Sequence, residues 1–140
     1  MKILFVCRSN VGRSQMAKAL YNSITQTKDS DSAGTQVELP GQTLLERTKE
    51  RPGASYVIDV MKEEGSDVSG YKRTQITQEM LNRYDLVVSM AAKSYTPSWL
   101  LKSSKYRYWD IPDPMGKNYK VTALARDRIK KKIEEELIKS

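Results

Sequence analysis

The sequence contains no histidine and a single cysteine, Cys7. One cysteine cannot form an internal disulfide, and without histidine the usual zinc sites and histidine-dependent catalytic arrangements are excluded. Any chemistry must therefore use Cys, Asp, Arg, Ser or Tyr side chains. We expect a protein that works without a metal ion or another cofactor.

Long apolar runs are also missing. The apolar start of the chain is too short for the core of a signal peptide, and no stretch approaches the roughly 20 residues that span a bilayer. These features predict a cytoplasmic protein that does not associate with a membrane.

The charge is strongly one-sided, because 24 Lys and Arg residues face 17 Asp and Glu residues and leave a net charge of +7. Such an excess favours anions, which include phosphorylated substrates as well as nucleic acid. The basic residues are spread along the chain, and no finger spacing or aromatic RNA-binding motif accompanies them. Their densest run, residues 126–132, lies on a predicted helix beside acidic residues and is typical of a solvated face. We therefore expect no specific nucleic-acid partner.

The 140 residues are the length of one typical domain, so we expect a single domain over residues 1–140. Apolar runs alternate with helical patterns, which predicts an α/β fold: a doubly wound parallel sheet with helices on both faces. Strands are expected at residues 2–6, 85–90 and 106–109, and helices at residues 13–27, 54–64, 77–83, 94–101 and 119–139. Leu124 and Ile138 are expected to widen the apolar stripe of the last helix. The charged piece at residues 36–53 is expected to be an excursion with a short helix.

The most informative stretch lies where the apolar run at residues 3–6 gives way to a helical pattern. It reads Cys7-Arg8-Ser9-Asn10-Val11-Gly12-Arg13-Ser14. A helix N-terminus offers unpaired N–H groups and the positive end of the peptide dipoles, which together bind phosphate or a similar oxyanion. To wrap its amides around an anion the loop must adopt left-handed conformations, for which Asn10 and Gly12 are the candidates. The small residues at 32–35 would let the backbone pass close to this loop.

Arg13 and Cys7 give this loop its chemistry. The planar fork of Arg13 can bind two oxygens of an anion held by the backbone N–H groups of residues 8–13. The same positive surroundings favour the thiolate form of Cys7, which is the nucleophilic form. A lone cysteine at a strand end is often only a small apolar residue, but its combination with this loop favours metal-independent phosphoryl transfer.

Asp113 is the candidate acid for that reaction. Attack by a thiolate on a phosphate monoester leaves an alkoxide or phenoxide that needs a proton, and histidine is not available to supply it. Asp113 lies between two prolines just after the strand expected at residues 106–109, so it should reach the same sheet edge as Cys7. Asp and Pro are also ordinary turn residues. For the nearby Asp110 we expect a role in capping or bracing the loop.

The Cys-x5-Arg-Ser loop and the late Asp-Pro together resemble the low molecular weight protein tyrosine phosphatases and equally the arsenate reductases that share their fold. Residues 31–35 and 75–90 add weaker matches, so the resemblance covers nearly the whole chain. It implies a four-stranded parallel sheet and a phosphocysteine intermediate on Cys7, with Arg13 as binder of the phosphoryl oxygens and Asp113 as general acid. The hydrogen-bonding supports of the loop that it implies are Asn10, Ser14 and Ser32.

Three positions depart from the family pattern. Gly12 occupies a position at which many of the phosphatases carry a second cysteine. Tyr71 aligns with a histidine that supports the loop in some members. Met115 and Gly116 follow the Asp-Pro, where aromatic residues often flank a phenyl ring, and Tyr119 lies further on.

Three functions are therefore compatible with the sequence. The first is a metal-independent phosphomonoesterase that acts on phosphotyrosine in a protein or on another small aryl phosphate. The second is an arsenate reductase in which Cys7 forms the first thiol adduct and an external thiol completes the reaction. The third is an anion-binding module without turnover.

Overall fold

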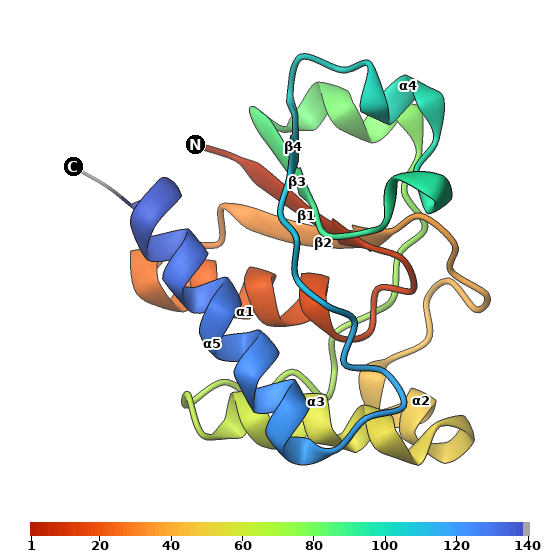
Figure 1. Ribbon diagram of the computed structural model, residues 1–140, viewed down its shortest axis with the longest axis vertical. Coiled ribbons are helices and arrows are strands. Elements are labelled where there is room, and N and C mark those ends of the chain that lie inside the picture. The colour runs from red at the N-terminus through yellow and green to blue at the C-terminus, as the bar shows by residue number, and fades with distance from the viewer. Residues whose placement is uncertain (139–140) are drawn as a thin grey trace.

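A computed structural model describes residues 1–138, and four parallel strands form its central sheet (Figure 1). The strands are β1 (Ile3–Cys7), β2 (Ser30–Gly34), β3 (Leu86–Ser89) and β4 (Tyr106–Tyr108). Their order across the sheet is β2-β1-β3-β4, with every neighbouring pair parallel. All five residues of β1 are buried, as expected for a central strand that is covered on both faces. The predicted four-stranded parallel sheet is confirmed.

Alternate residues of β1 enter two separate apolar clusters. Ile3 and Phe5 pack with α1 (Arg13–Thr25), α3 (Ser55–Lys62) and α5 (Tyr119–Glu136), which together cover one face of the sheet (Figure 1). Leu4 and Val6 pack on the other face with residues of the 3₁₀ helix η2 (Gln78–Arg83) and the short helix α4 (Ser98–Leu101). The prediction of helices on both faces is confirmed, although the second face has only short ones.

The helix predicted at residues 94–101 is interrupted at a proline. A 3₁₀ turn, η3 (Lys93–Tyr95), comes first, and α4 begins only after Pro97. Thr96 is extended (φ −110°, ψ 127°) because a residue before proline is pushed out of the helical region. Pro97 is therefore the residue before the helix, and the prediction of a helix that begins at residue 94 is wrong.

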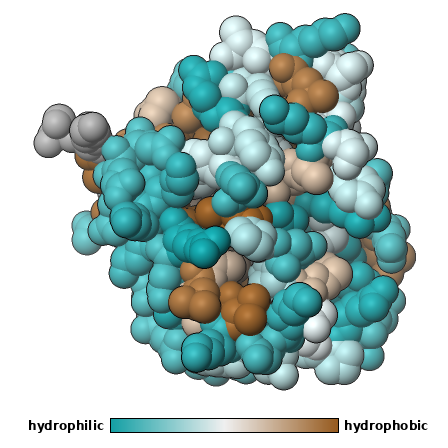
Figure 2. Space-filling view, in the orientation of Figure 1, coloured by the Kyte–Doolittle hydropathy of each residue, from teal (hydrophilic) through white to brown (hydrophobic). Residues whose placement is uncertain are grey.

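The inner face of α5 is more polar than its apolar spacing predicts. Leu124 is 53% exposed and Ile138 is 36% exposed, so the expectation that they widen the buried stripe is wrong. Thr122 and Arg126 are buried instead, and Arg126 Nη1 donates hydrogen bonds to the Val60 carbonyl (2.9 Å) and to the carboxylate of Glu63, the residue directly after α3 (2.6 Å). The surface that carries α5 is mostly hydrophilic, with scattered apolar side chains (Figure 2). The helix ends at Glu136, and its expected last residue, 139, lies outside the described residues.

The excursion at residues 36–53 contains the expected short helix, α2 (Leu44–Glu50), followed by a 3₁₀ turn, η1 (Pro52–Ala54). Thr43 and Glu46 form a capping box, in which each side chain satisfies a backbone N–H at the start of α2. Leu44 is fully buried and anchors the helix on the core. Within residues 1–138, no helix combines the length and the apolar character that a membrane crossing requires.

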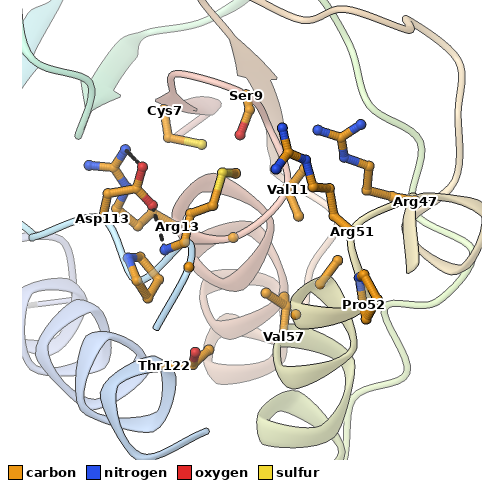
Figure 3. Close-up of a pocket in the computed structure, with 16 residues that line it drawn as sticks. Cys7, Ser9, Val11, Arg13, Arg47, Arg51, Pro52, Val57, Asp113 and Thr122 are labelled. Carbon is orange, nitrogen blue, oxygen red and sulfur yellow. Dashed lines mark hydrogen bonds and ion pairs between the residues drawn. The ribbon is translucent and has the colours of Figure 1, made fainter. Parts of the chain in front are cut away.

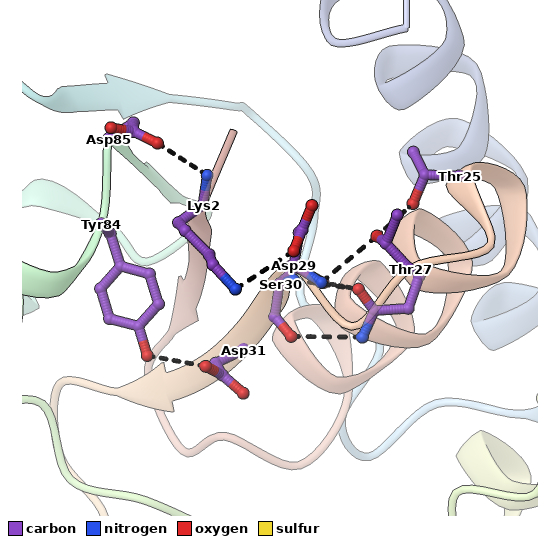
Figure 4. Close-up of polar contacts among 9 residues, drawn as sticks. Lys2, Thr25, Thr27, Asp29, Ser30, Asp31, Tyr84 and Asp85 are labelled. Atoms are coloured by element: carbon purple, nitrogen blue, oxygen red, sulfur yellow. Dashed lines mark hydrogen bonds and ion pairs between the residues drawn. The ribbon is translucent and has the colours of Figure 1, made fainter.

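Polar contacts hold the edge of the sheet at which the strands begin (Figure 4). The Tyr84 hydroxyl donates a hydrogen bond to the Asp31 carboxylate (2.9 Å), and the Lys2 ammonium pairs with the Asp29 carboxylate (3.1 Å). Burial, together with the bond to Asp31, raises the pKa of Tyr84 to about 12. The pKa is raised, so the stability that this group contributes is complete below pH 10 and is lost between about pH 10 and 12.

An alkaline titration should therefore show a tyrosine that ionises near pH 12. We expect the tyrosinate absorbance of the wild-type protein to rise in a late step that the Tyr84→Phe variant lacks. Tyr108, which is 40% exposed, provides the control, since Tyr108→Phe should retain the late step. If Tyr84→Phe leaves the late step in place, the bond between Tyr84 and Asp31 does not control this ionisation.

Candidate active site

The loop between β1 and α1 and the segment after β4 both lie at the edge of the sheet where the strands end (Figure 3). Cys7 is the last residue of β1 and Arg13 is the first of α1. Asp113 follows β4, whose neighbour β3 pairs with β1. The Arg13 Nη2 and Asp113 Oδ2 atoms are 3.7 Å apart, so the structure brings the three predicted catalytic side chains together.

Two polar side chains hold Cys7. Its sulfur lies 3.0 Å from the Ser14 hydroxyl oxygen, and Asn10 Nδ2 donates to that same oxygen (2.7 Å). The amide of Asn10 is fixed in this orientation because its Oδ1 accepts the Thr74 N–H (2.7 Å). The Ser14 hydroxyl can accept from Asn10 and still donate its own proton to the sulfur, because a hydroxyl is both a donor and an acceptor.

The loop backbone turns at a single left-handed residue. Asn10 has φ 57° and is fully buried, whereas Gly12 has φ −97°. The prediction of left-handed backbone is confirmed at Asn10 and is wrong at Gly12. A Cβ added to Gly12 would make only ordinary contacts with Val57 (3.7 Å) and Pro114 (3.8 Å), so the structure has room for a small side chain at this position.

The backbone of the loop offers a row of hydrogen-bond donors. The five N–H groups of Arg8, Ser9, Asn10, Val11 and Gly12 donate to no acceptor within the described residues 1–138. Buried N–H groups normally have partners, so a run of such groups beside the start of a helix is suited to an oxyanion. The backbone therefore supports the predicted anion cradle.

Arg13 is locked in place from one side. Its Nη1 donates to the carbonyl oxygens of Met90 (2.5 Å) and Ile111 (3.0 Å), and the residue is only 7% exposed. These two bonds use both protons of Nη1, which leaves the Nε and Nη2 donors for an anion. That edge of the guanidinium is the planar fork that matches two oxygens at once.

Asp113 has one oxygen anchored and one directed at the site. Oδ1 accepts the Met115 N–H (2.9 Å), while Oδ2 faces Arg13, and the side chain is 49% exposed. Asp110 behaves differently, because its carboxylate accepts no hydrogen bond from any of the residues described and does not line the cavity. The structure therefore gives no hydrogen bond by which Asp110 would brace the loop.

The cavity above Cys7 has a volume of about 180 Å³. Its apolar lining residues include Pro52, Val57, Pro114 and Met115, and Pro52 and Val57 lie on the same side of it (Figure 3). No aromatic side chain of residues 1–138 lines the cavity, and Tyr119 packs edge-on against another tyrosine (ring centroids 6.3 Å apart) outside the lining. The volume falls below the roughly 300–1,000 Å³ of sites for drug-sized ligands, so the cavity suits a phosphate and the first part of a leaving group.

The other predicted residues lie behind or beside the cavity. Ser9 and Val11 line it, while the Arg8 side chain turns away to donate to Gln36 (3.1 Å) and to stack on the Tyr95 ring (3.8 Å). Any contact of Arg8 with a bound phosphate would therefore come from its backbone N–H. Ser32 supports the loop indirectly, because its hydroxyl bonds to Gln15, which in turn bonds to the Asn10 carbonyl.

Two supporting residues were missed by the sequence analysis. Arg73 is 1% exposed and donates through Nε (3.1 Å) and Nη2 (3.0 Å) to the Ser9 carbonyl. Gln15 donates to the Asn10 carbonyl (3.1 Å) and in turn accepts the Ser32 hydroxyl proton (2.7 Å). Gln15 could have been suspected as a polar residue directly after the motif, and Arg73 from its place just before the matching segment at residues 75–90.

Tyr71 does not support the loop, which is the role of the aligned histidine in some members of the family. Its ring packs under the Lys18 ammonium (4.4 Å from the ring centroid), and Arg73 supplies the support of the loop instead.

Gly34 allows the close approach of backbones that its small size predicts. A Cβ at Gly34 would lie 2.8 Å from the Arg8 carbonyl oxygen and 2.9 Å from the Asn10 nitrogen, which no side chain could accommodate without displacing the loop.

The model of the low molecular weight phosphotyrosine protein phosphatase family matches residues 2–140. The chain belongs to this family. In solved structures it is similar to the low molecular weight protein tyrosine phosphatase of T. tengcongensis, with a TM-score of 0.80 and 25% identity over 96% of each chain.

Other relatives in the family are named arsenate reductases. The chain is 33% identical to arsenate reductase 2 of Staphylococcus epidermidis, over 94% of this chain and 92% of that protein. It is 29% identical to the glutaredoxin arsenate reductase of Synechocystis sp., over 95% of this chain and 93% of that protein. The family therefore includes phosphatases and arsenate reductases, and membership alone leaves both activities open.

Proposed function

We propose that this protein is a cysteine-dependent phosphomonoesterase of the protein tyrosine phosphatase type. The observation that carries the proposal is the single constellation of the Cys7 sulfur, the free Nε and Nη2 edge of Arg13 and the Asp113 carboxyl around one cavity. An aryl phosphate fits the aliphatic walls, and its phosphate would meet the row of loop N–H groups. No metal is needed, because the amides and Arg13 supply the positive field.

The reaction has two steps. In the first, the Cys7 thiolate attacks phosphorus, the P–O ester bond breaks, and Asp113 gives its proton to the departing oxygen. In the second, water attacks the phosphocysteine, Asp113 takes a proton from that water, and the S–P bond breaks. Inorganic phosphate leaves, and Cys7 returns as the thiolate. A cytoplasmic location, where a lone thiol stays reduced, is part of this proposal.

Arsenate reduction is the second candidate, and the arsenate reductases among the relatives support it. Arsenate is close in shape to phosphate and would occupy the same cradle. Cys7 is the only cysteine of the chain, so the second thiol would have to come from outside. Under this alternative the reaction requires glutathione or a comparable thiol.

One pair of assays distinguishes the two activities. We expect the purified protein to release phosphate from phosphotyrosine and phenyl phosphate in the presence of a metal chelator. We expect no comparable turnover of arsenate, whether glutathione or thioredoxin is the thiol source. Reduction of arsenate with added glutathione, together with inert aryl phosphates, would reverse the assignment.

A further inference from the structure

The cavity above Cys7 opens into a second hollow of about 420 Å³. The two share Ser9, Arg47, Arg51, Asp113 and Met115 in their linings. Because the first cavity holds a phosphate and only the start of a leaving group, the rest of a larger substrate must lie over this rim. The second hollow is therefore where the region beside the phosphorylated group would rest.

Arginines dominate the second hollow. Arg8, Arg47, Arg51 and Arg73 line it, against the carboxylates of Glu38 and Asp113. Two of the four are engaged elsewhere, since Arg73 holds the Ser9 carbonyl and Arg8 bonds to Gln36. Arg47 and Arg51 remain, on α2 and directly after it, across the cavity from Asp113 (Figure 3). Their guanidinium groups extend toward Ser9 in that view.

Arg47 has an unusual environment for a charged side chain. The residue is 5% exposed, and its Nε is buried without a hydrogen-bond partner among residues 1–138. Its closest carboxylate oxygen, on Glu50, is 3.7 Å from Nη1. A buried guanidinium with an unpaired donor is destabilising unless a ligand satisfies it. Burial and the neighbouring Arg47 charge also lower the pKa of Arg73, which reflects the crowding of positive charge here.

Arg51 extends the same positive surface to the exterior. It is exposed, and its guanidinium makes no ion pair or hydrogen bond with any group in the described part of the chain. A carboxylate in the hollow could pair with both arginines, and the fork of a guanidinium matches a carboxylate in two-point contact.

We propose that Arg47 and Arg51 form a second anion subsite, which binds the carboxylate of an acidic residue next to the phosphorylated residue of a peptide substrate. The proposal rests on the phosphatase activity proposed above and names its substrate class: phosphorylated segments with flanking Asp or Glu. It also gives the excursion at residues 36–53 a function, since α2 carries this subsite to the rim of the active site.

Matched phosphotyrosine peptides test the subsite. One peptide carries Glu on both sides of the phosphotyrosine and the other carries Gln, so the leaving group is identical. We expect kcat/KM to be about tenfold higher for the Glu peptide at low salt, in line with one charge-assisted contact, and to fall toward parity at high salt. In the Arg51→Gln variant the ratio should fall to near one, and Arg47→Gln should act in the same direction.

Arg83→Gln is the matched control. Arg83 is exposed and ends η2, at the opposite edge of the sheet from the Cys7 loop, so its loss changes the net charge equally but leaves the ratio near tenfold. Equal rates for the two peptides in the wild-type protein, or an equal loss of the ratio in Arg83→Gln, would overturn the subsite alone. Failure to hydrolyse either peptide would overturn the proposed function and the subsite with it.

Discussion

Replacement of Cys7 by serine is expected to lower the turnover of aryl phosphates by roughly 10⁴- to 10⁶-fold, the loss seen when an enzyme loses its covalent nucleophile. A serine hydroxyl needs a base to become a nucleophile, and the sequence offers no histidine. The only side chain that contacts the Cys7 sulfur by hydrogen bonding in the described structure is Ser14, and a neutral hydroxyl is too weak a base to take that proton.

Oxyanion binding should survive the same substitution. The loop N–H groups and the Nε and Nη2 edge of Arg13 do not depend on the sulfur, because Arg13 is fixed by the Met90 and Ile111 carbonyls. Titration calorimetry with inorganic phosphate should therefore still detect binding to Cys7→Ser. Arg13→Lys is the matched comparison, since an ammonium cannot reproduce the planar two-point contact, and it should weaken phosphate binding. Wild-type turnover by Cys7→Ser would contradict the assignment of the nucleophile.

The sheet and the position of the loop were predictable because their signals are local. The run at residues 3–6 is apolar at every position. Its side chains point alternately to the two faces of the sheet, and all of them are buried. The change from this run to a helical pattern placed Cys7 and Arg13 at the two ends of one turn, and the carboxyl edge of the sheet then brought Asp113 to them. The parallel direction of the strands follows from their alternation with helices, whereas their order across the sheet was not predicted.

The supports of the loop could not be predicted from local patterns because their partners are distant in sequence. Arg73 contacts Ser9 across 64 residues, and Thr74 contacts Asn10 across the same separation. The buried position of Arg126 in the core could not be predicted from local patterns for the same reason. Spacing alone favoured an apolar Leu124 at the inner face of α5, but the carbonyl of Val60 on α3 and the carboxylate of Glu63 directly after it select the arginine.

The excursion was the least predictable part of the site. Between its two Pro-Gly turns the sequence has the charge of a solvated loop, and Leu44 and Leu45 are the only apolar residues of that charged piece. The capping box at Thr43 and the burial of Leu44 fix α2, whereas Leu45 is 58% exposed. Once α2 is fixed in this way, Arg47 and Arg51 reach the cavity rim, a consequence of tertiary packing that no periodicity in the sequence encodes.

Asp113→Asn is expected to slow the hydrolysis of phenyl phosphate by about 10²- to 10⁴-fold, the usual contribution of a general acid. Hydrolysis of a nitro-substituted phenyl phosphate should be slowed far less, because its leaving oxygen needs little protonation. The amide is close in shape to the carboxyl and can keep the contact of Oδ1 with the Met115 N–H, so the loop itself should be preserved. The measurement is the ratio of kcat values for the two substrates in each variant.

Asp110→Asn supplies the control for this prediction. Asp110 is exposed, three residues from Asp113 in the same loop, and lies outside the cavity lining, so its substitution should leave the ratio of the two substrates at the wild-type value. The position of Asp113 explains the contrast, since its Oδ2 faces the Arg13 guanidinium that would hold the transferring phosphoryl group. If the dependence on the leaving group appears in Asp110→Asn, the acid is wrongly assigned; if it appears in neither variant, the proton comes from outside this loop.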